Sequence, residues 1–114
     1  MSKPQAASNI IDAASLRAAR ELAYAEFQKN QSVGRLTKEL TKLSDQLLRH
    51  LWNQCGLDNE ATLVAVGGYG RGALFPYSDI DILILLPADE QQARIISKQV
   101  EQFITSCWDV GLEI

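Results

Sequence analysis

Two apolar runs, separated by a glycine-rich segment and a pair of aspartates, dominate the middle of the chain. The first run ends at Val66, four glycines follow within residues 67–72, and Asp79 and Asp81 precede the second run. Side chains of a strand alternate between its two faces, so residues two apart point the same way. We therefore predict that Asp79 and Asp81 project side by side from the start of a strand.

The aspartate pair indicates a metal site. Two carboxylates at this spacing repel each other unless a positive charge lies between them. A hard divalent cation with oxygen ligands meets that need, and Mg²⁺ bound together with substrate phosphates is the usual case. Asp79 and Asp81 are therefore the candidate metal ligands and catalytic residues, with Mg²⁺ as the expected cofactor. Taken without its neighbours, the motif also fits an acidic pair that merely begins a strand at solvent.

The glycine segment is typical of an anion-binding loop. Gly67 and Gly68 follow directly on the first apolar run, and glycines let a ligand approach backbone amides closely. Arg71 adds a planar donor fork that suits phosphate, and Ser78 adds a hydroxyl beside the aspartates. The spacing matches neither the GxxxxGK[ST] loop nor the GxGxxG turn. Combined with the metal pair, these residues predict nucleotide binding and in-line nucleotidyl transfer.

Two amphipathic helices are predicted before this segment. The first covers about residues 10–28, with Asp12 as a candidate N-cap, and residues 30–34 interrupt the pattern. The second covers about residues 33–55, where a near-heptad stripe favours packing on a sheet and leaves a helical dimer open as an alternative. The stripe consists of Leu36, Leu40, Leu43, Leu47, Leu51 and Cys55.

The second half predicts strand, loop, strand, helix and strand. A short strand at 62–66 leads into a loop at 67–77 with one helical turn, and the apolar run 80–86 suits a central strand covered on both faces. A helix capped by Asp89 should follow to about Cys107, and a further strand should open near 109–114. The side chains expected in the core are Trp52, Ile95, Ile96, Val100, Phe103, Ile104, Cys107 and Trp108.

Size and charge narrow the class of protein. The chain has 114 residues and a net charge of −3, which suits one small domain and argues against non-specific nucleic-acid binding. Cys55 and Cys107 lack a CxxC spacing and are expected as buried apolar residues, not as a zinc site or a disulfide. The sequence shows no signal peptide and no apolar run long enough to span a membrane, so we expect a cytoplasmic protein.

These motifs resemble a known family. Gly67-Gly-Tyr-Gly-Arg-Gly followed by Ser78-Asp-Ile-Asp81 resembles the signature of the DNA polymerase beta-like nucleotidyltransferase superfamily. Within it, the fuller string GGYGRGALFPYSDIDILIL resembles the bacterial uridylyltransferases that modify the PII signal protein of nitrogen regulation. The likeness covers residues 64–86 closely, and the final WDVGLEI resembles a later block of the same enzymes. Residues 1–60 match only in being helical.

The resemblance implies a fold and a reaction. The fold is α+β, with an N-terminal helical region at 1–60 and a truncated nucleotidyltransferase core with a small mixed sheet at 61–114. UTP would bind with Mg²⁺, a tyrosine hydroxyl of PII would attack the α-phosphorus, and pyrophosphate would leave. Carried over residue by residue, the first two glycines and the arginine and serine named above hold the phosphates, and the two aspartates bind the metal.

Two departures from the family pattern stand out. Ala73 replaces an acidic residue expected in many relatives, and the third carboxylate usual in the superfamily has Glu113 as its one late candidate. The enzymes it resembles are also far longer, with a phosphohydrolase domain that removes the uridylyl group and small-molecule-sensing domains. We therefore expect a fragment of a multifunctional enzyme, with part of the nucleotide site and little or no activity alone.

Two other functions fit parts of the sequence. The first is another enzyme of the superfamily, either a small nucleotidyltransferase of a toxin–antitoxin pair or an adenylyltransferase of glutamine synthetase. The long leading helices and the amino-acid sequence of residues 69–77 disfavour both of these enzymes. The second is a non-catalytic helical interaction module that dimerises through the leucine stripe. Nucleotide preference separates the enzymes, and substitution of the aspartates separates enzyme from module.

Overall fold

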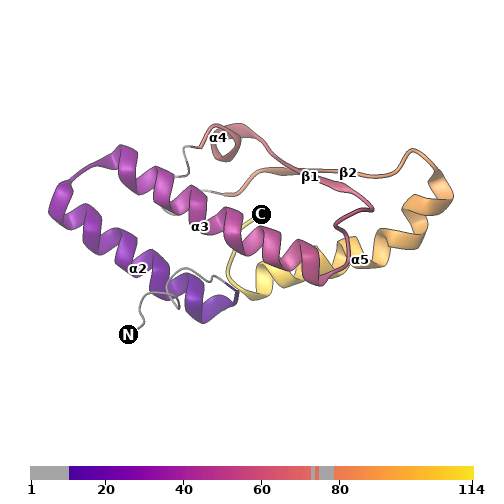
Figure 1. The fold of residues 1–114 in the computed structure, drawn as a ribbon, viewed down its shortest axis with the longest axis horizontal. Helices are drawn as coiled ribbons and strands as arrows, with labels where there is room; N and C mark the ends of the chain where they lie inside the picture. The colour runs from indigo at the N-terminus through magenta and orange to yellow at the C-terminus, as the bar shows by residue number, and fades with distance from the viewer. Residues whose placement is uncertain (1–10, 73, 75–78) are drawn as a thin grey trace.

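Three long helices, one helical turn and a two-stranded hairpin make up the computed structural model, which describes residues 11–72, 74 and 79–114 (Figure 1). The predicted α+β class is confirmed. The elements in chain order are α2 (Ala13–Asn30), α3 (Val33–Gln54), β1 (Thr62–Ala65), α4 (Gly67–Gly70), β2 (Ile82–Leu85) and α5 (Glu90–Asp109).

The helix ends follow from local capping. Asp12 caps α2 as predicted, because its carboxylate accepts a hydrogen bond from the Ser15 amide at 2.8 Å. The helix ends at Asn30, and Gln31 then takes a left-handed conformation with φ of 57°. Ser32 caps α3 by accepting from the Arg35 amide. Each cap satisfies amides that the first helical turn leaves without partners, so two helices with a tight connection form here.

The leucine stripe of α3 forms the centre of the core. Its apolar face is buried between α2 and α5, with Leu47 fully buried. Trp52 meets Phe103 of α5 edge to face, with ring centroids 5.0 Å apart, a geometry that aromatic pairs favour. Because the stripe is covered within the chain, it is not available as a dimer interface. The core joins residues on both sides of residue 60.

The hairpin packs on the core through one face only. β1 and β2 are antiparallel, with Leu63 opposite Ile84 on the covered face and Val64 opposite Leu83 on the outer face. Leu83 and Leu85 are 49% and 50% exposed. The prediction that this strand is covered on both faces is therefore wrong for the described chain, because no described element lies over the outer face (Figure 1).

The strand predicted near 109–114 is also absent from the described residues. Helix α5 continues to Asp109, and Gly111 reverses the chain with φ of 95°. The last residues then run beside β2's start, where the Ile80 amide donates to the Glu113 carbonyl at 2.7 Å. A single hydrogen bond does not form a β-ladder, so this segment lies beside the sheet but is not a strand of it.

Two core predictions on α5 are wrong. Ile95 is 63% exposed and Trp108 is 60% exposed, whereas Ile96 and Cys107 beside them are buried. Adjacent residues of a helix point about 100° apart, so only one of each neighbouring pair reaches the core. Both cysteines are free, with Cys107 buried as predicted and Cys55 half-buried, and burial raises the pKa of the Cys107 thiol to about 12.

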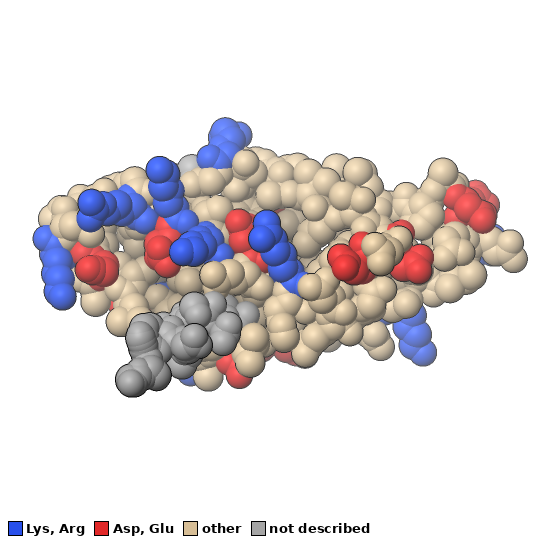
Figure 2. Space-filling view, viewed as in Figure 1, with Lys and Arg blue, Asp and Glu red and all other residues tan. Residues whose placement is uncertain are grey.

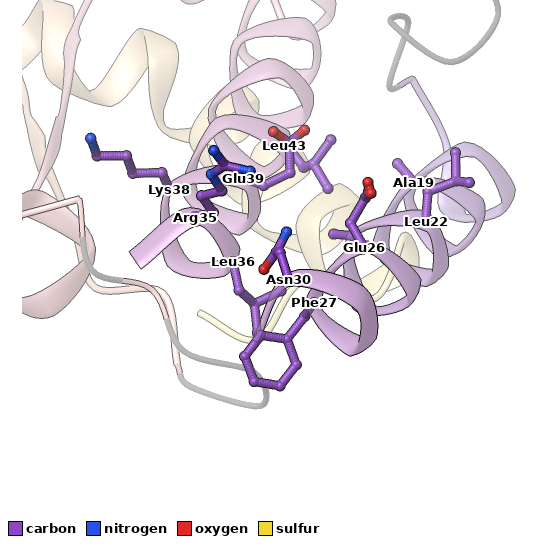
Figure 3. A pocket seen from close by; sticks show the side chains of 11 residues that line it. Ala19, Leu22, Glu26, Phe27, Asn30, Arg35, Leu36, Lys38, Glu39 and Leu43 are labelled. Carbon is purple, nitrogen blue, oxygen red and sulfur yellow. The ribbon is translucent and has the colours of Figure 1, made fainter. Parts of the chain in front are cut away.

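A surface groove runs between α2 and α3. It encloses about 540 Å³ and is lined by side chains of both helices, among them Leu22, Phe27 and Leu36 (Figure 3). None of the candidate phosphate or metal residues lines it. In the described ranges, no helix is both long and apolar enough to cross a membrane.

We predict that Phe103→Ala strongly destabilises the chain. Phe103 is fully buried against Trp52, and truncation of such a residue leaves a cavity that costs about 3–5 kcal/mol. Urea unfolding followed by tryptophan fluorescence measures the loss. The control is Ile95→Ala on the same helix, which should cost less than about 1 kcal/mol because the side chain is exposed. Equal effects of the two substitutions would contradict this core.

Candidate functional site

Asp81 and the glycine turn meet just before β2. Ile80 is buried, while Asp79 and Asp81 on either side of it are exposed. Gly67 has φ of 62°, and a Cβ there would lie 2.8 Å from Oδ2 of Asp81. The Asp81 carboxylate therefore lies directly against the glycine backbone, in space that any side chain would fill.

The glycine turn is a single helical turn, α4, that begins immediately after β1. The amides of Gly67, Gly68 and Tyr69 belong to its first turn and have no acceptor within the helix. A Cβ on Gly70 would lie 2.7 Å from the Ala65 carbonyl oxygen. The turn is thus folded tightly onto the end of β1, and this close approach requires glycine.

Two hydrogen bonds attach the glycine turn to helix α3. The Tyr69 hydroxyl donates to Asp45, and the Leu74 amide donates to the Thr41 hydroxyl at 3.3 Å. Tyr69 and Leu74 are both only 4% exposed. Burial, and then the hydrogen bond to Asp45, raise the pKa of the Tyr69 phenol far above its ordinary value. This side chain therefore packs and bonds inward and is not free to stack on a base.

The other predicted site residues are placed as follows. Arg71 follows α4 directly and is exposed, with its amide bonded to the Gly67 and Gly68 carbonyls. Ser78 and Ala73 lie outside the described residues. Glu113 is exposed while Leu112 before it is buried, and its carbonyl accepts from Ile80.

The described residues suit a divalent cation held jointly with phosphates. Asp79 and Asp81 supply two exposed carboxylates, and Mg²⁺ typically binds one or two carboxylates plus substrate phosphates. Within 11–72, 74 and 79–114, no group of three or more acidic, histidine or cysteine side chains is arranged to hold a metal. The donor set thus fits a cation that receives its remaining ligands from water and substrate.

Lys and Arg side chains gather toward one end of one face of the molecule. Figure 2 shows most of that face's Lys and Arg toward the end where α2 and α3 join and where α4 lies, and Asp and Glu side chains along its whole length. The basic groups at this end are therefore interleaved with acidic ones.

Sequence reasoning missed the residues of α3 that support the turn. Thr41 and Asp45 are one helical turn apart and face the glycine turn. The sequence does place these two polar residues next to the leucine stripe, at the edge of the helix, where contacts with neighbouring elements are expected. Nothing in the sequence indicates which loop they contact, because Tyr69 lies 24 residues beyond Asp45.

Comparison with protein families identifies one match. The model described as "Nucleotidyltransferase domain" matches residues 46–113, more than half of the chain. These residues include the whole glycine turn and both aspartates. The resemblance drawn from residues 64–86 is therefore confirmed at the level of the domain. No solved structure matches the chain.

Curated relatives share the same region. The chain is 46% identical over 101 residues to a bifunctional uridylyltransferase/uridylyl-removing enzyme of Burkholderia thailandensis, covering 89% of this chain and 12% of that protein. It is also 46% identical over 99 residues to the enzyme so named in Cupriavidus metallidurans, of which it covers 11%. The chain thus spans about an eighth of the length of these relatives.

We predict that Gly67→Ala destabilises the chain more than Gly72→Ala does. Both positions have positive φ, so both substitutions carry backbone strain of about 1–2 kcal/mol. Only at Gly67 would the new methyl also collide with Asp81, since nothing lies within 4 Å of a Cβ at Gly72. Urea unfolding of the two variants measures the difference, and equal losses would show that the Asp81 contact does not form.

We also predict a pH dependence that comes from Tyr69. The folded chain keeps this phenol protonated at a pH where the unfolded chain releases the proton, because its pKa is raised on folding. The unfolded state then binds fewer protons, so the free energy of unfolding falls as pH rises above about 10. Tyr69→Phe should flatten this fall. Unfolding midpoints between about pH 8 and 11 test it, and identical slopes in both proteins would refute it.

Proposed function

The chain belongs to the nucleotidyltransferase domain family, and on that premise we propose that it is part of a Mg²⁺-dependent uridylyltransferase. The substrate would be UTP, and the acceptor would be a tyrosine hydroxyl of the PII nitrogen-regulatory protein. The relatives named as uridylyltransferases support the nucleotide, because the match to them covers 89% of this chain. The choice of PII rests on the resemblance of residues 64–86 to enzymes that modify it.

The proposed reaction is a nucleotidyl transfer. The phenolic oxygen of the acceptor bonds to the α-phosphorus of UTP, the bond between the α- and β-phosphates breaks, and the acceptor loses its proton. The products are a uridylylated tyrosine and pyrophosphate. Bound Mg²⁺ would neutralise charge on the phosphates and align the attacking and leaving oxygens.

Each candidate residue has a role in that reaction. Asp79 and Asp81 would hold the cation. The first-turn amides of Gly67 and Gly68 would donate to phosphate oxygens, and the guanidinium of Arg71 would balance their charge. Ser78 would add a hydroxyl contact, and Glu113 would be the candidate third carboxylate. These roles follow the family motif, position by position.

One observation carries the proposal. The Asp81 carboxylate lies against the backbone of Gly67, 2.8 Å from where a Cβ would be. This contact brings Asp81, a candidate metal ligand, beside the backbone amides of the glycine turn. It therefore supports a site in which the cation and these amides bind the same nucleotide.

The whole enzyme needs more than these residues. The described part offers two candidate metal-binding carboxylates, and the chain covers 12% of a matched relative. We therefore expect nucleotide binding without efficient PII uridylylation from the 114 residues alone. Removal of the uridylyl group, the other activity in the relatives' name, would lie outside this domain. We further propose a cytoplasmic location, where nucleotide and signal protein meet.

The test is Mg²⁺-dependent binding of UTP, measured by calorimetry with ATP and CTP as comparison ligands. We predict that Asp79→Asn with Asp81→Asn lowers the affinity for UTP at least about tenfold, because a bound cation loses both protein ligands. The matched control is Glu21→Gln with Glu101→Gln, two exposed carboxylates on α2 and α5 that change the net charge equally.

Two results would contradict the proposal. Equal affinity for UTP in the Asp79/Asp81 variant and in the matched control would remove the metal site from this loop. Preference for ATP or CTP over UTP would favour an adenylyltransferase or another relative in the superfamily. A non-catalytic module is the conclusion if binding of every nucleotide is independent of Mg²⁺ and of both aspartates.

A further inference from the structure

One face of helix α3 holds two residues of this segment, Tyr69 inside the glycine turn and Leu74 four residues beyond its end. Both side chains are nearly fully buried. The Tyr69 hydroxyl donates to Asp45, and the Leu74 amide donates to Thr41. These two attachments restrain residues 70–72, which lie between them.

Arg71 lies at the middle of the attached segment. Its amide donates to the carbonyls of Gly67 and Gly68, each at 3.2 Å, and the Gly72 amide donates to the Tyr69 carbonyl at 3.0 Å. The exposed guanidinium therefore extends from backbone that is bonded to the phosphate-binding glycines and to Tyr69. A shift of Tyr69 away from α3 would move the Arg71 backbone with it.

The supporting residues precede the matched domain. The family model begins at residue 46, and Thr41 and Asp45 lie before it on α3. Their two side chains are one helical turn apart, so they act as a single rigid face. Figure 1 shows α4 over this part of α3, which the hydrogen bonds confirm as a direct contact.

The hydrogen bond between Tyr69 and Asp45 should be sensitive to substitution of either residue. Asp45 and Tyr69 line a hollow of about 620 Å³ between α3 and the hairpin, together with Arg49 and Trp52. A hydrogen bond to a carboxylate is stronger than one between neutral groups. Removal of the phenol oxygen leaves the half-buried Asp45 acceptor without this donor and removes the side-chain hydrogen bond that joins Tyr69 to α3.

We propose that Asp45 and Tyr69 are positioning residues, which lock the glycine turn onto α3 and so hold Arg71 and the Gly67–Asp81 contact in place for the nucleotide phosphates. Neither residue is among those proposed to contact the substrate. This inference rests on the proposed function for its ligand, but the lock itself is a property of the chain that is measurable without any nucleotide.

The first arm of the test measures the lock without nucleotide. Amide exchange by NMR should become about tenfold faster at Gly70, Arg71 and Gly72 in Tyr69→Phe, since these amides are bonded only within the turn. Amides of the hairpin and of α5 should keep their rates. The control is Tyr24→Phe, a half-buried phenol on α2, which should leave all three rates unchanged.

Substitutions at Asp45 give a rescue test. Asp45→Asn keeps an oxygen that accepts from the phenol and should retain slow exchange at the turn, whereas Asp45→Ala should match Tyr69→Phe. Unchanged exchange at residues 70–72 in Tyr69→Phe and Asp45→Ala would overturn the lock. Equal acceleration along the whole chain would also overturn it, because it would indicate general destabilisation.

The second arm measures affinity for Mg²⁺ and UTP. Tyr69→Phe should weaken binding roughly fivefold to tenfold, within the range expected for loss of one hydrogen bond of typical net strength. In an Arg71→Ala background the same substitution should have a smaller effect than in wild type, because part of the contribution of Tyr69 acts through Arg71. Fully additive losses would refute that route, since independent sites add.

The two proposals fail in different ways. If wild type binds no UTP, or if binding ignores Asp79 and Asp81, the proposed function fails, and faster exchange at the turn still establishes the lock. If UTP binds through the aspartates while Tyr69→Phe changes neither exchange nor affinity, the function stands and the positioning role is wrong.

Discussion

Burial of the leucine stripe on α3 is the constraint on which the other elements depend. The helix lies between α2 and α5, and Leu47 at its centre has no exposed surface. Once that face is committed to the core, the edge of the same helix points toward the hairpin and the glycine turn. The core and the site therefore share one rigid element, and disturbance of α3 reaches both.

The candidate site combines a tight backbone with open side chains. Glycine at position 67 allows Asp81 to approach the main chain, and glycine at position 70 allows the turn to fold onto Ala65. Asp79, Asp81 and Arg71 remain exposed beside this compact backbone. This combination of a fixed backbone and exposed charged side chains suits a phosphate site. The fixed backbone donors need little reorganisation on binding, and the charged side chains stay accessible to the ligand.

Local and periodic features could be predicted from the sequence, and pairings between distant residues could not. The caps at Asp12 and Asp89 and the leucine stripe depend on neighbours within a few positions. The exposure of Trp108, the missing strand at 109–114 and the bond between Tyr69 and Asp45 depend on which elements meet in space. Apolar character alone does not decide that.

The uncovered face of the hairpin carries two kinds of surface on one strand. Asp81, Leu83 and Leu85 alternate with the half-buried Ile82 and Ile84 and share that face, about 7 Å apart in successive steps. Whatever molecule or segment covers the two leucines also excludes water from the carboxylate beside them. The local dielectric constant then falls, and attraction between the aspartates and a cation grows. Exposure of the two leucines to water thus affects how strongly the neighbouring aspartates attract a cation.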